Sequence, residues 1–204
     1  MSEAREQILG RIRAALSDRP DAPGVPWTYG SAVGTGAVDV VDRFIERVAD
    51  YRAQVSRVDD AGPAIALALN GFGRVVADED VIREWPEVGS WVSDSGLSAA
   101  ELDAVDAVVT TATVGIANTG TIVLSHGPGQ GRRALSLVPD VHVCVVRVDQ
   151  IVDDVPHAVA RLIESGLHTR PLTWISGPSA TSDIELDRVE GVHGPRTLRV
   201  IVVG

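Results

Sequence analysis

Residues 141 to 148, VHVCVVRV, constrain the fold of this chain more than any other stretch. They form a nearly continuous run of apolar and β-branched residues, which is typical of a strand buried on both faces of a sheet. On either side of this run, segments with helical spacing of apolar residues alternate with short β-rich segments. The alternation predicts an α/β fold built on a doubly wound sheet of mixed or parallel strands.

The same periodicities predict the individual elements. Helices are expected at residues 38–52, 62–70, 79–84 and 155–164. Strands are expected at residues 53–58, 74–77, 90–93, 107–117, 121–125, 141–148, 173–176 and 198–203. A tight turn at Asn-Thr-Gly joins the strand 107–117 to the strand 121–125.

The N-terminal part of the chain differs from the rest. Residues 3 to 17 predict an amphipathic helix, because apolar side chains recur at every fourth position: Ile8, Ile12 and Leu16. Residues 19 to 36 are rich in proline and glycine and lack an apolar period, which predicts a linker. We therefore divide the chain into an N-terminal helix with its linker, residues 1–36, and an α/β domain, residues 37–204. The helix is expected to pack on a second copy of the chain and so to form a homo-oligomer.

Charge and residue usage exclude several functions. A formal net charge of −10 opposes binding to nucleic acid or to an anionic membrane. All 18 basic residues are arginine, so mechanisms that need a Schiff-base or P-loop lysine are excluded. The single cysteine, Cys144, lies in an apolar run and is interpreted as a core residue, and no apolar segment reaches the ~20 residues of a membrane span. Without an apolar signal region, the protein is expected in the cytoplasm.

Residues 125 to 133, SHGPGQGRR, form a glycine-rich loop that ends in two arginines. Its backbone N–H groups could form an anion-binding nest, with Arg132 or Arg133 supplying a bidentate guanidinium. The alternative is a mobile surface loop whose glycines only turn the chain.

Two loops near the C-terminus carry further candidate residues. Residues 176 to 183 offer Ser179, Thr181 and Asp183 after a predicted strand, where ligands bind in open α/β sheets. Residues 191 to 196 offer His193 and Arg196 in a rigid Gly-Pro frame. We expect both loops to line one anion-binding pocket at the carboxyl edge of the sheet.

Structural roles are the alternatives for these residues. The hydroxyl and carboxylate groups could cap their own loop, and Arg196 could pair with Asp183 or Glu185. The remaining histidines, His126, His142, His157 and His168, lack metal-ligand spacing, so no metal site is expected.

Four motifs occur in order along the C-terminal half: GIANTGTIVL (115–124), VPDVH (138–142), GPSATSDIE (177–185) and GVHGPR (191–196). Together they resemble the LUD-domain family, of the lactate utilization protein C subtype. The resemblance is clear from about residue 105 onward, and the N-terminal helix and proline-rich linker are also similar to that subtype. It implies a fold like that of ribose-phosphate isomerases and CoA transferases. Thr119 and Gly120 of the first motif are further candidate ligand-binding residues, in addition to Arg132.

One position departs from the family pattern. The residue before Thr-Gly in the first motif is usually acidic in the family, whereas this chain has Asn118. An amide is neither a nucleophile nor a general base, so the glutamate-thioester chemistry of related acyl transferases is doubtful here. We expect Asn118 to shape the turn instead.

The resemblance implies a non-redox component of a system that oxidises L-lactate to pyruvate, with separate iron–sulfur redox subunits as partners and a small anionic ligand. With one cysteine and no dinucleotide-binding fingerprint, no cofactor is expected on the chain itself. A free-standing isomerase- or CoA-transferase-like enzyme acting on a phosphorylated or CoA-linked substrate is the alternative. A binding subunit that senses a small carboxylate is the third, and whether the chain is an enzyme stays open.

Overall fold

A computed structural model describes residues 3–17, 24, 30–178 and 194–204 of the protein. The chain divides into two compact units, Met1–Ser31 and Ala32–Gly204, which are considered separately. The first unit contains helix α1 (Glu3–Ala15), and its apolar side chains Ile8 and Ile12 are exposed, as is Leu16 just after the helix. No helix in the described ranges has the length and apolar character needed to cross a membrane. The boundary expected between residues 36 and 37 stays a prediction.

The second unit is built on a six-stranded sheet in the order β1-β10-β7-β4-β2-β3, in which every pair of neighbours is parallel. Its strands are β1 (Gln54–Val58), β2 (Val75–Ala77), β3 (Trp91–Ser93), β4 (Ala107–Thr111), β7 (Val141–Arg147) and β10 (Thr197–Val203). Most of the apolar run 141–148 forms β7, in the interior of the sheet, where five consecutive residues are buried. The α/β fold and its largely parallel sheet are therefore confirmed.

A smaller sheet in the order β8-β5-β6-β9 packs beside the large one. It consists of β5 (Val114–Ile116), β6 (Thr121–Leu124), β8 (Ile151–Val152) and β9 (Thr173–Ile175). Strand β6 is antiparallel to both β5 and β9, whereas β5 and β8 are parallel.

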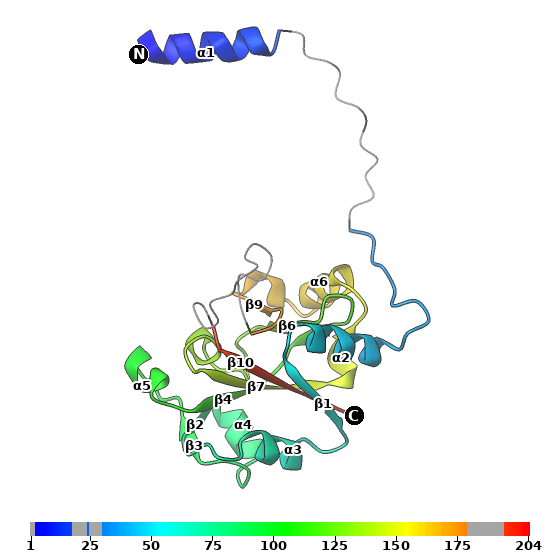
Figure 1. Ribbon diagram of the computed structural model, residues 1–204, viewed down its shortest axis with the longest axis vertical. Coiled ribbons are helices and arrows are strands. Elements are labelled where there is room, and N and C mark those ends of the chain that lie inside the picture. The colour runs from blue at the N-terminus through cyan, green and yellow to red at the C-terminus, as the bar shows by residue number, and fades with distance from the viewer. Residues whose placement is uncertain (1–2, 18–23, 25–29, 179–193) are drawn as a thin grey trace. The chain divides into compact units, whose positions relative to one another are not determined.

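Helices and the small sheet cover the large sheet from its two sides (Figure 1). The helices of the second unit are α2 (Val40–Asp50), α3 (Ala61–Ala68), α4 (Glu79–Glu84), α5 (Ala99–Asp103) and α6 (Val155–Glu164), with short 3-10 helices η1 (Arg133–Ser136), η2 (Val148–Gln150) and η3 (Leu167–Thr169). On one side, α3 and α4 pack on alternate strand residues such as Val143 and Ile201. On the other side, α2 and the small sheet pack on Cys144 and Val200. Helix α6 covers the far face of the small sheet.

The expected strand 107–117 is wrong as a single element. The chain leaves the large sheet after Thr111, and its next strand, β5, belongs to the small sheet. At this crossing the Ala112 carbonyl accepts a hydrogen bond from Gln150 Nε2 (2.7 Å), while the Thr113 N–H already donates to Val123 (2.9 Å). A run of β-forming residues predicts an extended backbone, but it does not predict which sheet the backbone joins. The change of sheet after Thr111 therefore cannot be seen in the sequence pattern.

Candidate functional site

The glycine-rich loop after β6 is held by the buried side chain of Gln130. Its Oε1 accepts from the N–H groups of Ser125 (2.7 Å) and His126 (3.1 Å), and its Nε2 donates to Thr113 Oγ1 (2.9 Å). The Gly129 N–H donates to Asp78 Oδ1 (2.9 Å), and the Gln130 N–H to the Gly127 carbonyl. These four backbone N–H groups already donate within the protein. They are therefore not available to the anion nest that the sequence predicted. Side chains are better placed to hold an anion here.

The two arginines at the end of this loop have different surroundings. Arg132 donates from Nε and Nη2 to the two carboxylate oxygens of Asp94 at 2.6 and 2.9 Å, and this hydrogen bonding lowers the pKa of Asp94. Arg133 is exposed, lines a cavity, and forms no ion pair with a carboxylate of the described residues. Among the described residues, Arg133 is therefore the cation beside the cavity that has no carboxylate partner, whereas Arg132 is paired with Asp94.

His126 is fixed between a carbonyl and a hydroxyl group. Its Nδ1 lies 3.2 Å from the Gly131 carbonyl oxygen, and its Nε2 lies 2.8 Å from Thr173 Oγ1. A carbonyl oxygen can only accept, so the proton is on Nδ1 and Nε2 accepts from the Thr173 hydroxyl. His126 also has a positive φ of 56°, which is uncommon for a residue other than glycine and is often found at functional sites.

The charge of His126 is controlled by its neighbours. Partial burial lowers its pKa, the hydrogen bond to Gly131 acts in the opposite direction, and the positive charges of Arg133 and Arg170 lower the pKa further. A histidine with a lowered pKa is neutral at pH 7. His126 is therefore able to accept a proton from a hydroxyl group at Nε2.

A cavity of about 540 Å³ lies beside this pair. Thr173, the hydrogen-bond partner of His126, lines it together with Arg133 and the neighbouring Trp174. The remaining lining residues come from η1, strand β9 and two loops: Ser136, Leu137, Leu172, Ile175, Ser176, Gly177, Pro178, Gly194 and Pro195. The described lining of the cavity thus combines one guanidinium, several hydroxyl groups and apolar walls, a composition suited to a small anion.

The turn between β5 and β6 connects to this cavity through hydroxyl groups. Thr119 Oγ1 lies 2.8 Å from Thr121 Oγ1, which in turn lies 2.8 Å from Ser176 Oγ at the cavity wall. Gly120 has a φ of +60°, and a Cβ there would lie 2.7 Å from a backbone atom of Arg47. Thr119 is therefore linked to the cavity wall through Thr121, whereas Gly120 packs against α2.

Most candidate residues of the two C-terminal loops cannot be placed, but the described ends of these loops can. Ser179, Thr181, Asp183 and His193 lie outside the described residues, so their shared pocket stays a prediction. The described ends of the two loops, Gly177-Pro178 and Gly194-Pro195, line the same cavity. Arg196 is exposed at the start of β10, lies 3.4 Å from Asp140 and is not among the lining residues.

Asn118 lies within the β5–β6 turn. Its Nδ2 donates to the Val33 carbonyl (2.7 Å), and its backbone N–H donates to the Asp153 carbonyl (2.9 Å). These contacts agree with the structural role expected from the sequence.

Comparison with known proteins identifies the family. Residues 77–203 match the LUD domain. The chain belongs to the LUD-domain family. This match contains the glycine-rich loop, His126, Thr173 and the described cavity residues, but it excludes α2, β1 and α3. The family resemblance of the four sequence motifs is thereby confirmed.

Relatives of this LUD-domain chain extend over its full length. It is 48% identical to "Lactate utilization protein C" of Deinococcus radiodurans, with 100% of this chain and 97% of the relative covered. It is 31% identical to the protein of the same name in Bacillus subtilis, with 98% and 95% covered. A crystal structure of a DUF162 family protein from Deinococcus radiodurans, 45% identical, superposes with a TM-score of 0.71 over 81% of this chain and 96% of that one. The α/β fold is thus shared with a solved relative.

His126, Thr173 and Arg133 were not singled out as a group at the sequence level. Arg133 was an alternative to Arg132, and nothing in the local sequence distinguishes the two. Thr173 comes 47 residues after His126, and the pairing of β9 with β6 brings them together. The one local feature in the sequence that marks this group is the position of His126 in the glycine-rich loop, directly before Gly127.

Proposed function

We propose that this LUD-domain chain acts in lactate utilization, as a non-redox component of a system that oxidises L-lactate to pyruvate. The names of its full-length relatives support the pathway. The single cysteine supports the non-redox role, since one thiol cannot bind an iron–sulfur cluster within one chain. Burial also raises the pKa of the Cys144 thiol to about 12, which disfavours the thiolate that metals require. Iron–sulfur subunits are proposed as separate partners.

We further propose that the cavity beside Arg133 binds a small carboxylate or a phosphate-bearing ligand. The observation that carries this proposal is the Arg133 guanidinium at a cavity wall, which no carboxylate of the described residues pairs, beside a neutral His126 bonded to Thr173. Arg133 would bind the anionic group, and Thr173 and Ser176 would donate or accept hydrogen bonds.

Thermal unfolding in the presence of L-lactate, pyruvate, inorganic phosphate or a CoA ester tests this binding, because a ligand that binds only the native state raises Tm. One of these anions is expected to raise the Tm of the wild-type protein and to lose most of this effect in Arg133→Gln. Arg83→Gln is the matched control, since Arg83 is an exposed arginine that pairs with Asp80 on α4. An equal response of both variants, or no response of the wild type to any of the four, would refute the anion site.

The enzymatic alternative is favoured by one observation, the hydrogen bond between His126 Nε2 and the Thr173 hydroxyl. A hydroxyl bonded to a neutral imidazole, with the other ring nitrogen fixed by a carbonyl, is an arrangement for general base catalysis. An isomerase- or transferase-like reaction would then require turnover of a phosphorylated or CoA-linked substrate by the purified chain alone. Lactate-dependent dye reduction that appears only after iron–sulfur subunits are added would instead support the component role.

A further inference from the structure

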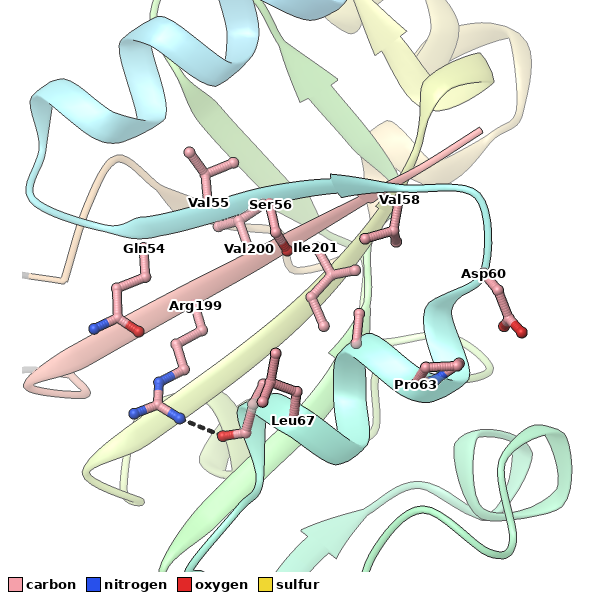
Figure 2. A pocket seen from close by; sticks show the side chains of 12 residues that line it. Gln54, Val55, Ser56, Val58, Asp60, Pro63, Leu67, Arg199, Val200 and Ile201 are labelled. Atoms are coloured by element: carbon pink, nitrogen blue, oxygen red, sulfur yellow. Dashed lines mark hydrogen bonds between the residues drawn. The ribbon is translucent and has the colours of Figure 1, made fainter.

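A second cavity, of about 600 Å³, lies on the α3 side of the large sheet, beneath its edge strand β1 (Figure 2). Residues of β1, β10 and α3 line it, and none of them lines the cavity beside Arg133. The strand β1 and the helix α3 precede the residues that match the LUD domain. This cavity is therefore separate from the candidate site described above.

Arg199 is the only basic residue in the described lining of this cavity. Its Nη1 donates to the Ala68 carbonyl at the end of α3, and its guanidinium carbon lies 5.4 Å from the centre of the Phe72 ring. No carboxylate of the described residues pairs with Arg199, and its Nε is buried without a hydrogen-bond partner. The helix carbonyl and the aromatic ring fix the cation but carry no formal negative charge.

Other arginines of the same chain show what such a guanidinium binds. Arg132 with Asp94, and Arg147 with Asp149, each use Nε and Nη2 to contact a carboxylate. Among the described residues, Arg199 forms a hydrogen bond only through Nη1 and meets no carboxylate, so the charge that a carboxylate would balance is still present at the cavity.

The rest of the cavity wall is mostly apolar. Val58 and Ile201 come from the sheet, and Ala64 and Leu67 from the helix. Leu67 is 76% exposed, the most exposed of the large apolar side chains in the described residues. Figure 2 shows Arg199 toward one end of this wall and Asp60 toward the other. Strand β1 runs between these two ends of the wall. Its five residues span roughly 13 Å, at a rise of about 3.3 Å per residue.

We propose that this cavity binds a monocarboxylate with an unbranched apolar chain. The carboxylate contacts Arg199, and the chain lies along Val58, Ala64, Leu67 and Ile201 toward Asp60. The single cation selects the charged group, the apolar wall selects the chain, and the volume is within the usual range for small-molecule sites. The apolar wall, with Asp60 at its far end, disfavours a second negative charge, so a dicarboxylate is expected to bind more weakly than the monocarboxylate with the same number of carbons.

Isothermal titration of the full-length protein with butanoate, hexanoate and octanoate tests the site. Each added methylene buried against the wall is expected to tighten Kd roughly fourfold. Adipate and hexylamine are expected to bind at least tenfold more weakly than hexanoate. The second carboxylate of adipate would lie against the apolar wall, and the ammonium group of hexylamine would meet Arg199. Lactate, which has only a methyl group to offer the wall, is also expected to bind weakly here. Affinity that does not depend on chain length or on the sign of the charge would overturn the proposal.

Two variants separate the site from general stability. Arg199→Gln is expected to weaken hexanoate binding by roughly 10- to 100-fold, the range for loss of a charged hydrogen-bond partner. Ala64→Phe fills the cavity, leaves Arg199 in place and is expected to abolish binding. Arg57→Gln is the control, since Arg57 is on β1 but pairs with Asp42 at the surface. Unchanged hexanoate affinity in a folded Ala64→Phe protein would exclude this cavity as the site, even if Arg199→Gln failed to fold.

The competing occupant is a second copy of the chain that covers the exposed edge of β1. Sedimentation of the wild type and of Leu67→Asp distinguishes it. A dimer that dissociates in Leu67→Asp would show that the groove is an interface and would overturn the proposal. The expected result is an oligomeric state that Leu67→Asp leaves unchanged, together with weaker octanoate binding. Because Arg133→Gln leaves this cavity intact, the variant is expected to bind hexanoate normally, whatever the fate of the function proposed above.

Discussion

Gly120 occupies a position where a side chain would collide with the backbone of α2. Its φ of +60° is in the left-handed region, and a Cβ would lie 2.7–2.8 Å from atoms of Arg47. The turn that carries Thr119 and Asn118 can therefore approach α2 only with glycine at this position. Gly71 offers a matched comparison, because it also has a positive φ, of +89°, but no atom lies within 4 Å of its Cβ position.

Gly120→Ala is expected to destabilise the protein by about 3 kcal/mol or more, whereas Gly71→Ala should cost about 1 kcal/mol from backbone strain alone. Urea denaturation of both variants measures the two free energies of unfolding. The difference between them isolates the collision with Arg47. Equal losses would show that α2 moves away without penalty.

His142 is fully buried in β7, and burial lowers its pKa to about 4 from an ordinary value of 6.5. Its Nε2 bonds to Thr110 Oγ1 (2.7 Å), and its Nδ1 has no partner among the described residues. Below pH 6.5 the unfolded chain binds a proton at this histidine that the folded protein does not, so stability falls as the pH decreases toward 4.

The free energy of unfolding is therefore expected to decrease by about 2 kcal/mol from this residue between pH 7.5 and pH 5. His142→Gln retains a group that can bond to Thr110 but does not titrate, so its stability should vary less with pH. Chemical denaturation of both proteins at several pH values gives the two slopes. Parallel slopes would contradict the assignment of the proton to His142.

Single residues also mark the limit of what the sequence could predict. Cys144 was correctly interpreted as a core residue, because its apolar neighbours decide its burial. The choice between Arg132 and Arg133 could not be made, since it depends on Asp94, a residue 38 positions earlier in the chain. Side-chain partners that are distant in sequence leave no local pattern.

At the scale of elements, most helices and strands could be predicted from periodicity and from their caps. The helix 155–164 has the bounds that the sequence indicated, and β7 ends one residue early. The short helix α5 was missed, although Ser98 and Glu101 form a capping box that marks its start. The division of 107–117 between two sheets was missed because it depends on partners elsewhere in the chain. Local signals thus place elements, and long-range pairing assigns them to sheets.

The glycine-rich loop is an element whose shape depends on one side chain. Gln130→Ala would leave the N–H group of His126 without its acceptor, and would leave the buried N–H group of Ser125 with only its longer hydrogen bond to Thr113 Oγ1 (3.2 Å). We expect a loss of about 2–4 kcal/mol in the free energy of unfolding, together with loss of the anion-dependent rise in Tm. Gln54→Ala, which changes an exposed glutamine outside the loop, is the control. If Gln130→Ala keeps full stability, the loop does not require this hydrogen bonding.

At the scale of the whole molecule, every buried core cluster of the described residues lies in the second unit. The clusters draw on residues from Val40 to Val203, and the α1 unit contributes none of them. The likeness to ribose-phosphate isomerases and CoA transferases that the family resemblance implies stays a prediction about this second unit. The sequence predicts a first helix and a linker that lacks apolar periodicity before the α/β domain, and the boundary at residues 36 and 37 stays a prediction.

A chain that begins at Ala32 is therefore expected to keep the Tm of the full protein within about 2 °C, because the described residues among the first 31 contribute no side chain to a core cluster. It retains Val33, whose N–H donates to Asp154 (2.8 Å) and whose carbonyl accepts from Asn118.

If α1 forms a homo-oligomer through Ile8, Ile12 and Leu16, as we propose, the shortened chain loses that association and keeps its anion response. Full-length Ile8→Asp/Ile12→Asp is the control, since it disrupts only the apolar stripe. Calorimetry and sedimentation of the three proteins give both quantities. A shortened chain with a clearly lower Tm would show that the second unit depends on α1, and unchanged association would show that the oligomer, if one forms, uses another surface.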